Sequence, residues 1–316
     1  MKKLDISKKS NWLRIAGILL SIAGTLFIIV RIRSVNWEIL SGIHSGFLIG
    51  SLAIGSLITL CGLLALSLQW RALLRASSDQ KTKTATAMRI YLVSNSAKYL
   101  PGNIGHLLSR NTFRSSLNTG HVQIAAASVV ELAFVILAAV GLVVISSAVS
   151  TRSLVEVPGV SEKLTTFFLL VISCIVVAAA ILFLLRKNKW LQKFLGAAGT
   201  MLPAILKKAP LALTVYAVYF LAIGTYTYLL LIEVNGLHPS INSYTTGIFA
   251  VTLSWLAGLV TPGAPAGIGV RETVMLLLLR GEFSEPSIII CSVLVRISSV
   301  IADVAGLAIG LSLRRR

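Results

Sequence analysis

Residues 261–272 of the chain read TPGAPAGIGVRE and interrupt a long hydrophobic sequence with two prolines, three glycines and an adjacent arginine and glutamate. Proline removes a backbone donor and glycine loosens a helical turn, so the segment should end or break a helix. A broken helix would leave free N–H groups at the start of VRETVMLLLL, where the helix dipole and Arg271 favour an anion. In the alternative interpretation, the segment is a tight cytoplasmic turn in which Arg271 and Glu272 only cap helices.

A second stretch of similar composition, SAKYLPGNIGHLLSR, occupies residues 96–110. Aligning Pro101 with Pro265 places the pattern P-x-x-I-G in both segments, followed by Arg110 in one and Arg271 in the other. Matching segments interrupted by glycine and proline in two halves of a chain point to the binding site of a transporter. We therefore expect two related halves that carry the motifs at 98–110 and 261–272. Parallel and inverted repeats both remain open.

Three ionisable residues lie inside apolar stretches, namely Glu131, Arg296 and Asp303. A charge at the centre of a membrane helix costs about 2.5–3.5 kcal/mol on insertion scales, so such residues usually face the interior of a bundle. Arg296 and Asp303 are seven positions apart, which places them on one helix face about two turns from each other. Each should meet a different helix, and Glu131 is a candidate partner for Arg296. Purely structural ion pairs are the alternative.

The composition indicates that these residues are positioned by membrane helices. Hydrophobic residues make up 56% of the 316 residues and charged residues 13%, with a mean hydropathy of +0.87. Soluble domains carry about 25% charged residues. The sequence therefore predicts a single all-α polytopic membrane domain over residues 1–316, with about eight transmembrane helices and one or two broken or re-entrant segments. The expected spans are about 13–30, 45–68, 122–149, 165–185, 211–232, 244–260, the broken unit 261–279, and 287–313.

Lysine and arginine collect in alternate connections between these spans, and the positive-inside rule then places both termini in the cytoplasm. The expected location is the inner (cytoplasmic) membrane. The net charge of +18 does not indicate nucleic-acid binding, because the basic residues flank hydrophobic spans and do not gather on one soluble face. The basic segment 186–208 has apolar residues at helical spacing. It is either a helix on the membrane surface or an ordinary basic loop.

No pattern of catalytic or metal-binding residues accompanies the spans. The three cysteines fall inside predicted spans, and the four histidines show no metal-ligand spacing. The sequence contains no phosphate-binding glycine loop and no arrangement of nucleophile and base. We therefore expect a protein that is not an enzyme and that needs no metal or cofactor.

The motifs KYLPGNIGHLLSR and PAGIGVRE, together with a last helix that contains Arg296, resemble the lysylphosphatidylglycerol synthase transmembrane-region family of flippase-like proteins. The segment VNWEIL at 35–40 resembles that family's short extracytoplasmic segment. In longer members this membrane unit precedes a soluble aminoacyl-transferase domain, whereas this sequence ends in LSLRRR. The resemblance therefore implies movement of a lipid between leaflets and does not imply lipid aminoacylation.

These observations favour a lipid translocase whose partners are anionic or glycan-linked membrane lipids, with oligomerisation left open. Two alternatives remain: an embedded enzyme that modifies a lipid head group, with Glu131 or Asp303 as general base, and a non-transporting scaffold for envelope enzymes. The candidate binding residues are the cations, the acids that balance them, and the residues that shape the two breaks: Lys98, Tyr99, Pro101, Gly102, Asn103, Gly105, Arg110, Glu131, Pro262, Gly263, Gly267, Gly269, Arg271, Glu272, Arg296 and Asp303.

Overall fold

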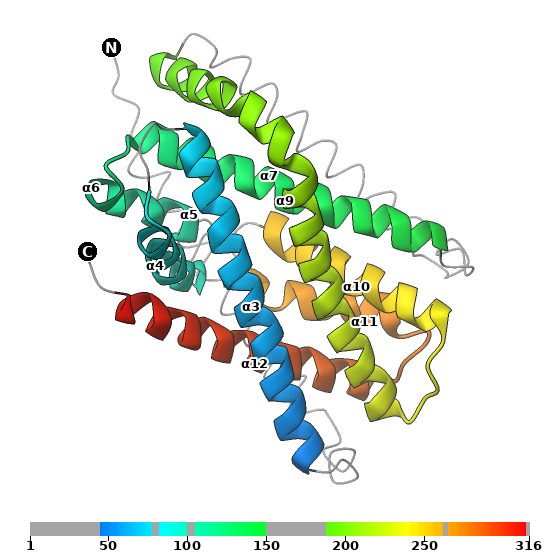
Figure 1. Cartoon of the computed structure of the whole chain (residues 1–316). Coiled ribbons are helices and arrows are strands. Elements are labelled where there is room, and N and C mark those ends of the chain that lie inside the picture. The colour runs from blue at the N-terminus through cyan, green and yellow to red at the C-terminus, as the bar shows by residue number, and fades with distance from the viewer. Residues whose placement is uncertain (1–44, 78–81, 100–104, 150–187, 262–264, 314–316) are drawn as a thin grey trace, which may run out of the picture.

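The computed structural model describes residues 45–77, 82–99, 105–149, 188–261 and 265–313, and the regular structure within these ranges is helical (Figure 1). The expected spans at 13–30 and 165–185 lie outside the described residues.

Five long helices form the body of the molecule (Figure 1). Each contains a segment that is long and apolar enough to cross a membrane, which confirms an all-α polytopic membrane fold. They correspond to five of the expected spans, although α3 and α9 extend well beyond them. Their bounds are α3 (Ser45–Ser77), α7 (His121–Val149), α9 (Lys189–Asn235), α10 (Ile241–Val260) and α12 (Glu285–Ser312).

Helix α9 contains both the expected fifth span and most of the basic segment at 186–208. It runs for 47 residues with Pro203 and Pro210 inside it, and Figure 1 shows it bending along its length. Each internal proline removes one helical hydrogen bond and bends the helix without ending it. The basic segment is therefore helical from Lys189 onward, and the loop interpretation is wrong there.

Several short elements gather at one end of the bundle. They lie near the C-terminal ends of α3 and α12 and the N-terminal end of α7 (Figure 1). Helix α4 packs against both α3 and α12, while α5 reaches α7. The short elements therefore connect α12 to α7 at this end. Their bounds are α4 (Thr84–Asn95), η1 (Ser96–Tyr99), α5 (Gly105–Arg110), η2 (Asn111–Phe113) and α6 (Arg114–Leu117).

The proline–glycine segment after α10 breaks the helix, as the sequence predicts. A 3₁₀ turn, η4 (Pro265–Gly267), precedes α11 (Val270–Leu279), which packs against α10 and α12. Ala266, Gly267 and Gly269 have φ values of 50°, 73° and 84°, which no α-helix allows. The ten residues of α11 extend about 15 Å, half of the roughly 30 Å of hydrocarbon in a bilayer.

Close packing of α3 on α9 depends on two glycines. A Cβ atom at Gly62 would lie 2.3 Å from the ring of Tyr219, and one at Gly55 would lie 2.4 Å from the ring of Tyr226. The two glycines are seven positions apart on α3, and the two tyrosines are seven positions apart on α9. The tyrosines therefore occupy two successive gaps on one face of α3. The absence of a side chain at these glycines lets the tyrosines lie between the helices.

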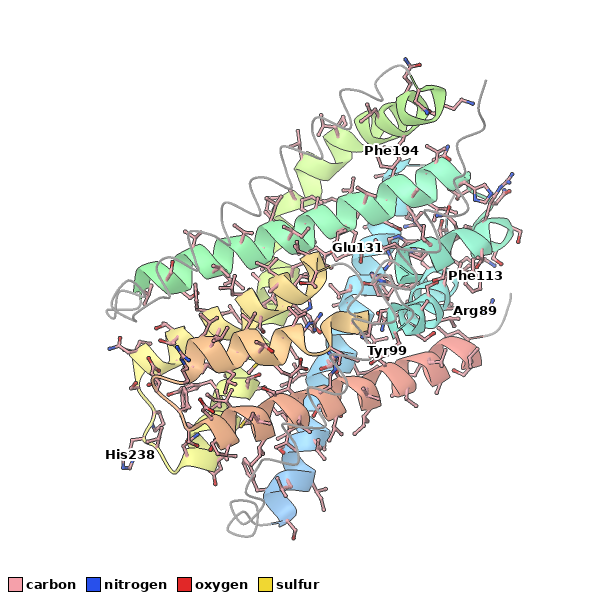
Figure 2. The ribbon with its side chains drawn as sticks, turned by 180° about the vertical axis from the view of Figure 1, so that it is seen from behind. Arg89, Tyr99, Phe113, Glu131, Phe194 and His238 are labelled. Carbon is pink, nitrogen blue, oxygen red and sulfur yellow. The ribbon has the colours of Figure 1, made fainter. Side chains whose placement is uncertain are left out.

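Charged and apolar residues are distributed as a membrane protein requires. Large apolar side chains, among them Ile49, Leu137 and Leu211, are exposed on the outer faces of the long helices. Arg89 lies at the end of the bundle that carries the short helices, and His238 lies at the opposite end (Figure 2).

Candidate functional site

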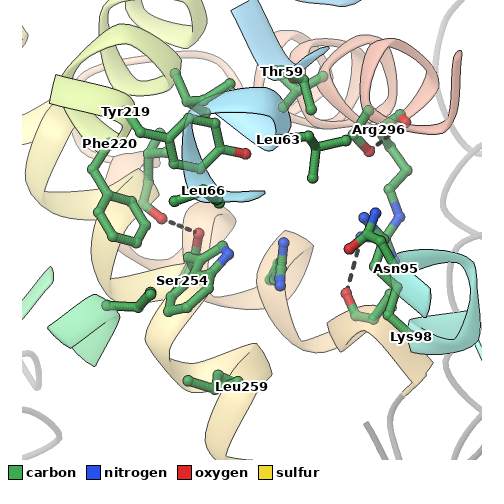
Figure 3. Close-up of a pocket in the computed structure, with 18 of the residues that line it drawn as sticks. Thr59, Leu63, Leu66, Asn95, Lys98, Tyr219, Phe220, Ser254, Leu259 and Arg296 are labelled. Carbon is green, nitrogen blue, oxygen red and sulfur yellow. Dashed lines mark hydrogen bonds between the residues drawn. The ribbon is translucent and has the colours of Figure 1, made fainter. Parts of the chain in front are cut away.

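A cavity of about 230 Å³ lies inside the bundle, and all five long helices contribute to its wall together with α4, η1, α5, η4 and α11. Figure 3 shows Tyr219 and Phe220 along one side of it and Asn95, Lys98 and Arg296 along the other. The turns η1 and η4 contact each other at this cavity. The segments that carry the two proline–glycine motifs therefore meet at the wall of this cavity.

Asp303 of α12 is surrounded by hydrogen-bond donors from the end of α4 and from η1. The Lys98 Nζ lies 2.7 Å from its Oδ2, and Asn95 Nδ2 donates to its Oδ1 at 2.8 Å. The hydroxyl of Tyr99 also donates to Oδ2. Asp303 is itself buried and contacts Lys98 and Tyr99, both of which line the cavity. This carboxylate neutralises Lys98 and attaches η1 and α4 to α12.

Glu131 of α7 has a similar environment on another side of the cavity. It forms an ion pair with Arg110, and its Oε1 accepts a hydrogen bond of 2.8 Å from the hydroxyl of Tyr91. The guanidinium of Arg110 lies over the rings of Tyr91 and Trp70, with its Cζ 4.3 and 4.9 Å from their centroids. Arg110 and Glu131 are 2% and 4% exposed, so both charges are buried as a pair.

The prediction that Glu131 pairs with Arg296 is therefore wrong. Helix α5 places Arg110 against α7, and Arg110 rather than Arg296 pairs with the carboxylate of Glu131. The prediction that Arg296 and Asp303 meet different elements is confirmed, because Arg296 contacts η4 and Asp303 contacts η1 and α4.

Arg271 has no such partner among the described residues. Its side chain forms no ion pair or hydrogen bond with the described residues, and its buried Nε lacks an acceptor. Its side chain lies across Gly258 and Gly267, where an added Cβ would come within 2.8 and 2.7 Å of Nε. The guanidinium approaches the ring of Trp255, 5.7 Å from the centroid. Two glycines thus allow Arg271 to reach the cavity wall.

Arg296 is also without a carboxylate partner within the described ranges. One nitrogen, Nη1, donates to the carbonyl oxygen of Ala266 at 3.1 Å, and the buried Nη2 has no acceptor. Ala266 has a left-handed backbone, which costs a residue with a Cβ about 1–2 kcal/mol. Since Arg296 holds η4 and Asp303 holds η1, the single helix α12 fixes both broken segments.

The start of α11 is capped by the side chain of Glu272, a residue of the same helix. The N–H of Gly269 donates to Oε2 of Glu272 at 2.8 Å. The sequence predicts that free N–H groups at this helix start would bind an anion. One of these N–H groups is instead bonded to a carboxylate of the protein itself. The capping interpretation therefore holds for Glu272, and both Glu272 and Arg271 line the cavity.

The sequence interpretation missed several residues that line the cavity. His106 has a buried Nδ1 without a hydrogen-bond partner, and its pKa is lowered to about 3, mainly by burial and further by the positive charges of Arg110 and Lys98. Tyr219 and Tyr226 of α9 also line it, as does Trp255 of α10. The matching seven-residue spacing of the α3 glycines and the α9 tyrosines is the signal that could have found the two tyrosines.

The predicted residues fall into three groups. Those that line the cavity are Lys98, Tyr99, Arg110, Glu131, Arg271, Glu272 and Arg296, and Asp303 contacts two of them. Gly105 begins α5, while Gly267 and Gly269 provide the positive φ values of the second break. Pro101, Gly102, Asn103, Pro262 and Gly263 lie outside the described residues.

Comparison with known proteins supports the family resemblance. The family described as the lysylphosphatidylglycerol synthase TM region matches residues 14–306. Searches of curated proteins and of solved structures found no match. The match covers nearly the whole sequence, including both motif segments and the helix that holds them. The chain therefore belongs to the lysylphosphatidylglycerol synthase transmembrane-region family.

Proposed function

We propose that this protein moves a lipid with an anionic, phosphate-bearing head group between the leaflets of the cytoplasmic membrane. The observation that carries the proposal is the presence of two arginines, Arg271 and Arg296, that line one cavity without a carboxylate partner in the described part of the chain. The other two cations of the wall, Lys98 and Arg110, are already neutralised by Asp303 and Glu131.

A phosphate would satisfy both arginines. A guanidinium presents N–H donors in a planar fork that matches phosphate oxygens, and charge-assisted bonds of this kind are about twice as strong as neutral ones. Nε of Arg271 and Nη2 of Arg296 are buried without acceptors, which is costly unless a ligand supplies them. An anion in the cavity would remove this cost and neutralise the local charge.

The dimensions of the cavity suit a head group and not a whole lipid. Its volume of about 230 Å³ is slightly below the range of about 300–1,000 Å³ typical of pockets for complete small molecules. Apolar side chains cover the outer faces of α3, α7 and α9, where acyl chains could remain in the bilayer while the head group enters. This division is what a translocase requires.

The arrangement gives less support to an embedded enzyme. A general base needs a carboxylate that can reach the proton of its substrate. Both candidate bases, Glu131 and Asp303, instead accept hydrogen bonds from a cation and a tyrosine of the protein.

The test is leaflet-resolved transport in proteoliposomes. Purified protein is reconstituted with phosphatidylglycerol that carries a fluorophore on an acyl chain, and a membrane-impermeant quencher reports how fast labelled lipid reaches the outer leaflet. We expect wild-type protein to accelerate transfer, and Arg271→Gln or Arg296→Gln to slow it at least tenfold. Arg280→Gln is the matched control, because Arg280 directly follows the helix that contains Arg271 and is exposed. Transfer by wild-type protein no faster than in empty vesicles would overturn the proposal.

A further inference from the structure

We infer that the cavity selects lipids by the charge of the head group: it accepts a net anionic head group and rejects one that carries an amine, whether zwitterionic or aminoacylated. This inference rests on the proposed function and specifies the substrate class of the same site.

The first argument is the balance of charge. Four cationic side chains line the cavity, namely Lys98, Arg110, Arg271 and Arg296. They face three carboxylates, because Glu131 and Glu272 line the same cavity and Asp303 binds Lys98 from behind. His106 is neutral near pH 7, since its pKa is about 3. The described wall therefore carries one net positive charge, which one additional negative charge neutralises.

The second argument is the supply of acceptors. An ammonium group carries three donors and no acceptor, so it needs oxygen atoms that are not already engaged. Asp303 accepts from Asn95, Lys98 and Tyr99. Glu131 accepts from Arg110 and Tyr91. An amine at either carboxylate would compete with these donors of the protein.

Near the two unpaired arginines, the nearest acceptors already receive hydrogen bonds from the protein. Oε2 of Glu272 accepts from the N–H of Gly269, and the carbonyl of Ala266 accepts from Arg296. An ammonium group next to Glu272 would also lie beside Arg271 and be repelled by it. A phosphate group, in contrast to an ammonium group, is attracted by the donors of Arg271 and Arg296 that have no partner.

These two arguments predict an order of transport rates. Phosphatidylglycerol, with a net charge of one negative, should cross fastest. Phosphatidylethanolamine carries the same phosphate and an amine, and it should be at least tenfold slower. Lysylphosphatidylglycerol, which carries two amines on its lysyl group, should be slowest.

The experiment measures the three head groups side by side in proteoliposomes, with the fluorophore on the acyl chain so that only the head group differs. Arg271→Gln removes the net positive charge of the wall, and the preference for phosphatidylglycerol over phosphatidylethanolamine should then fall below threefold. Arg271→Lys keeps the charge and should keep most of the preference. Arg280→Gln should leave the wild-type order unchanged.

The outcomes separate the two proposals. If wild-type protein moves none of the three lipids, the transport function itself fails. If it moves all three equally, or the lysyl lipid fastest, transport stands and the charge selection is overturned. The wild-type order decides the matter even if Arg271→Gln does not fold, because that comparison needs no variant.

Discussion

At the residue scale, the cavity wall contains two kinds of cation. Lys98 and Arg110 each bind a buried carboxylate that a neighbouring tyrosine also contacts. Arg271 and Arg296 line the same cavity without any carboxylate partner in the described residues. The paired cations anchor helices, and the unpaired ones remain available to a ligand.

The buried pair of Arg110 and Glu131 gives a prediction of stability. Glu131→Gln leaves the guanidinium of Arg110 buried without its counter-charge, which should lower the free energy of unfolding by about 3–5 kcal/mol. Arg110→Gln should cost a similar amount. Unfolding of the detergent-solubilised protein measures both, and Glu233→Gln, at an exposed carboxylate, is the control.

The double variant Arg110→Gln with Glu131→Gln should lose less stability than the sum of the single changes, because neither charge is then left alone. Strictly additive losses would show that the two residues do not depend on each other.

His106 gives a prediction of pH dependence, since it lies in α5, outside the five candidate spans. Its pKa falls from an ordinary 6.5 to about 3 on folding. Between these values the unfolded chain binds the proton and the folded protein does not, so stability falls as pH decreases from about 6.5 toward 3. His106→Asn removes this contribution. Thermal unfolding between pH 7.5 and about 4.5 should therefore show a smaller loss in the variant than in the wild type, and parallel losses would contradict the assignment.

At the element scale, the packing of α3 on α9 depends on gaps that only glycine leaves. Gly62→Ala places a Cβ 2.3 Å from the ring of Tyr219 and should lower the free energy of unfolding by about 1–3 kcal/mol through overpacking. Because Tyr219 lines the cavity, transport should slow as well. Gly50→Ala is the matched control on the same helix, where an added Cβ meets no atom within 4 Å. Equal thermal stability of the two variants would rule out this account.

Hydropathy and proline–glycine patterning predicted the elements well and the side-chain pairs less well. The five long apolar stretches that the structure describes are helices, and the helix breaks after α10, because length, apolarity and backbone chemistry are local properties. The partner of Glu131 could not be read from the chain. It depends on where α5 places Arg110, and that follows from tertiary packing. The same holds for Arg271, whose position needs Gly258 of α10 as well as Gly267 of η4.

At the scale of the whole molecule, basic residues concentrate at one end of the bundle. Arg71 and Arg75 lie toward the C-terminal end of α3, and Arg89 lies nearby in α4 (Figure 2). The opposite end carries His238 and the acidic residue Glu285 at the start of α12. From this asymmetry and the positive-inside rule, we propose that the end with the short helices faces the cytoplasm.

Cysteine labelling in whole cells tests that orientation. In a chain whose Cys61, Cys174 and Cys291 are replaced by alanine, His238→Cys should react with a membrane-impermeant maleimide from outside. Ser115→Cys should react only after the membrane is permeabilised. Both positions are exposed, so access to the reagent is the variable that differs. The reverse labelling pattern would invert the orientation.

The short length of α11 has a consequence for the energy of crossing. A full-length helix would expose nothing but side chains through the whole thickness of hydrocarbon, whereas α11 is about half that long and begins beside Arg271. If the protein moves lipids as we propose, a head group bound there would replace its lost hydration with guanidinium donors inside the bundle. The proposed site would thereby divide the single high barrier of an unassisted lipid into two lower steps with a bound position between them.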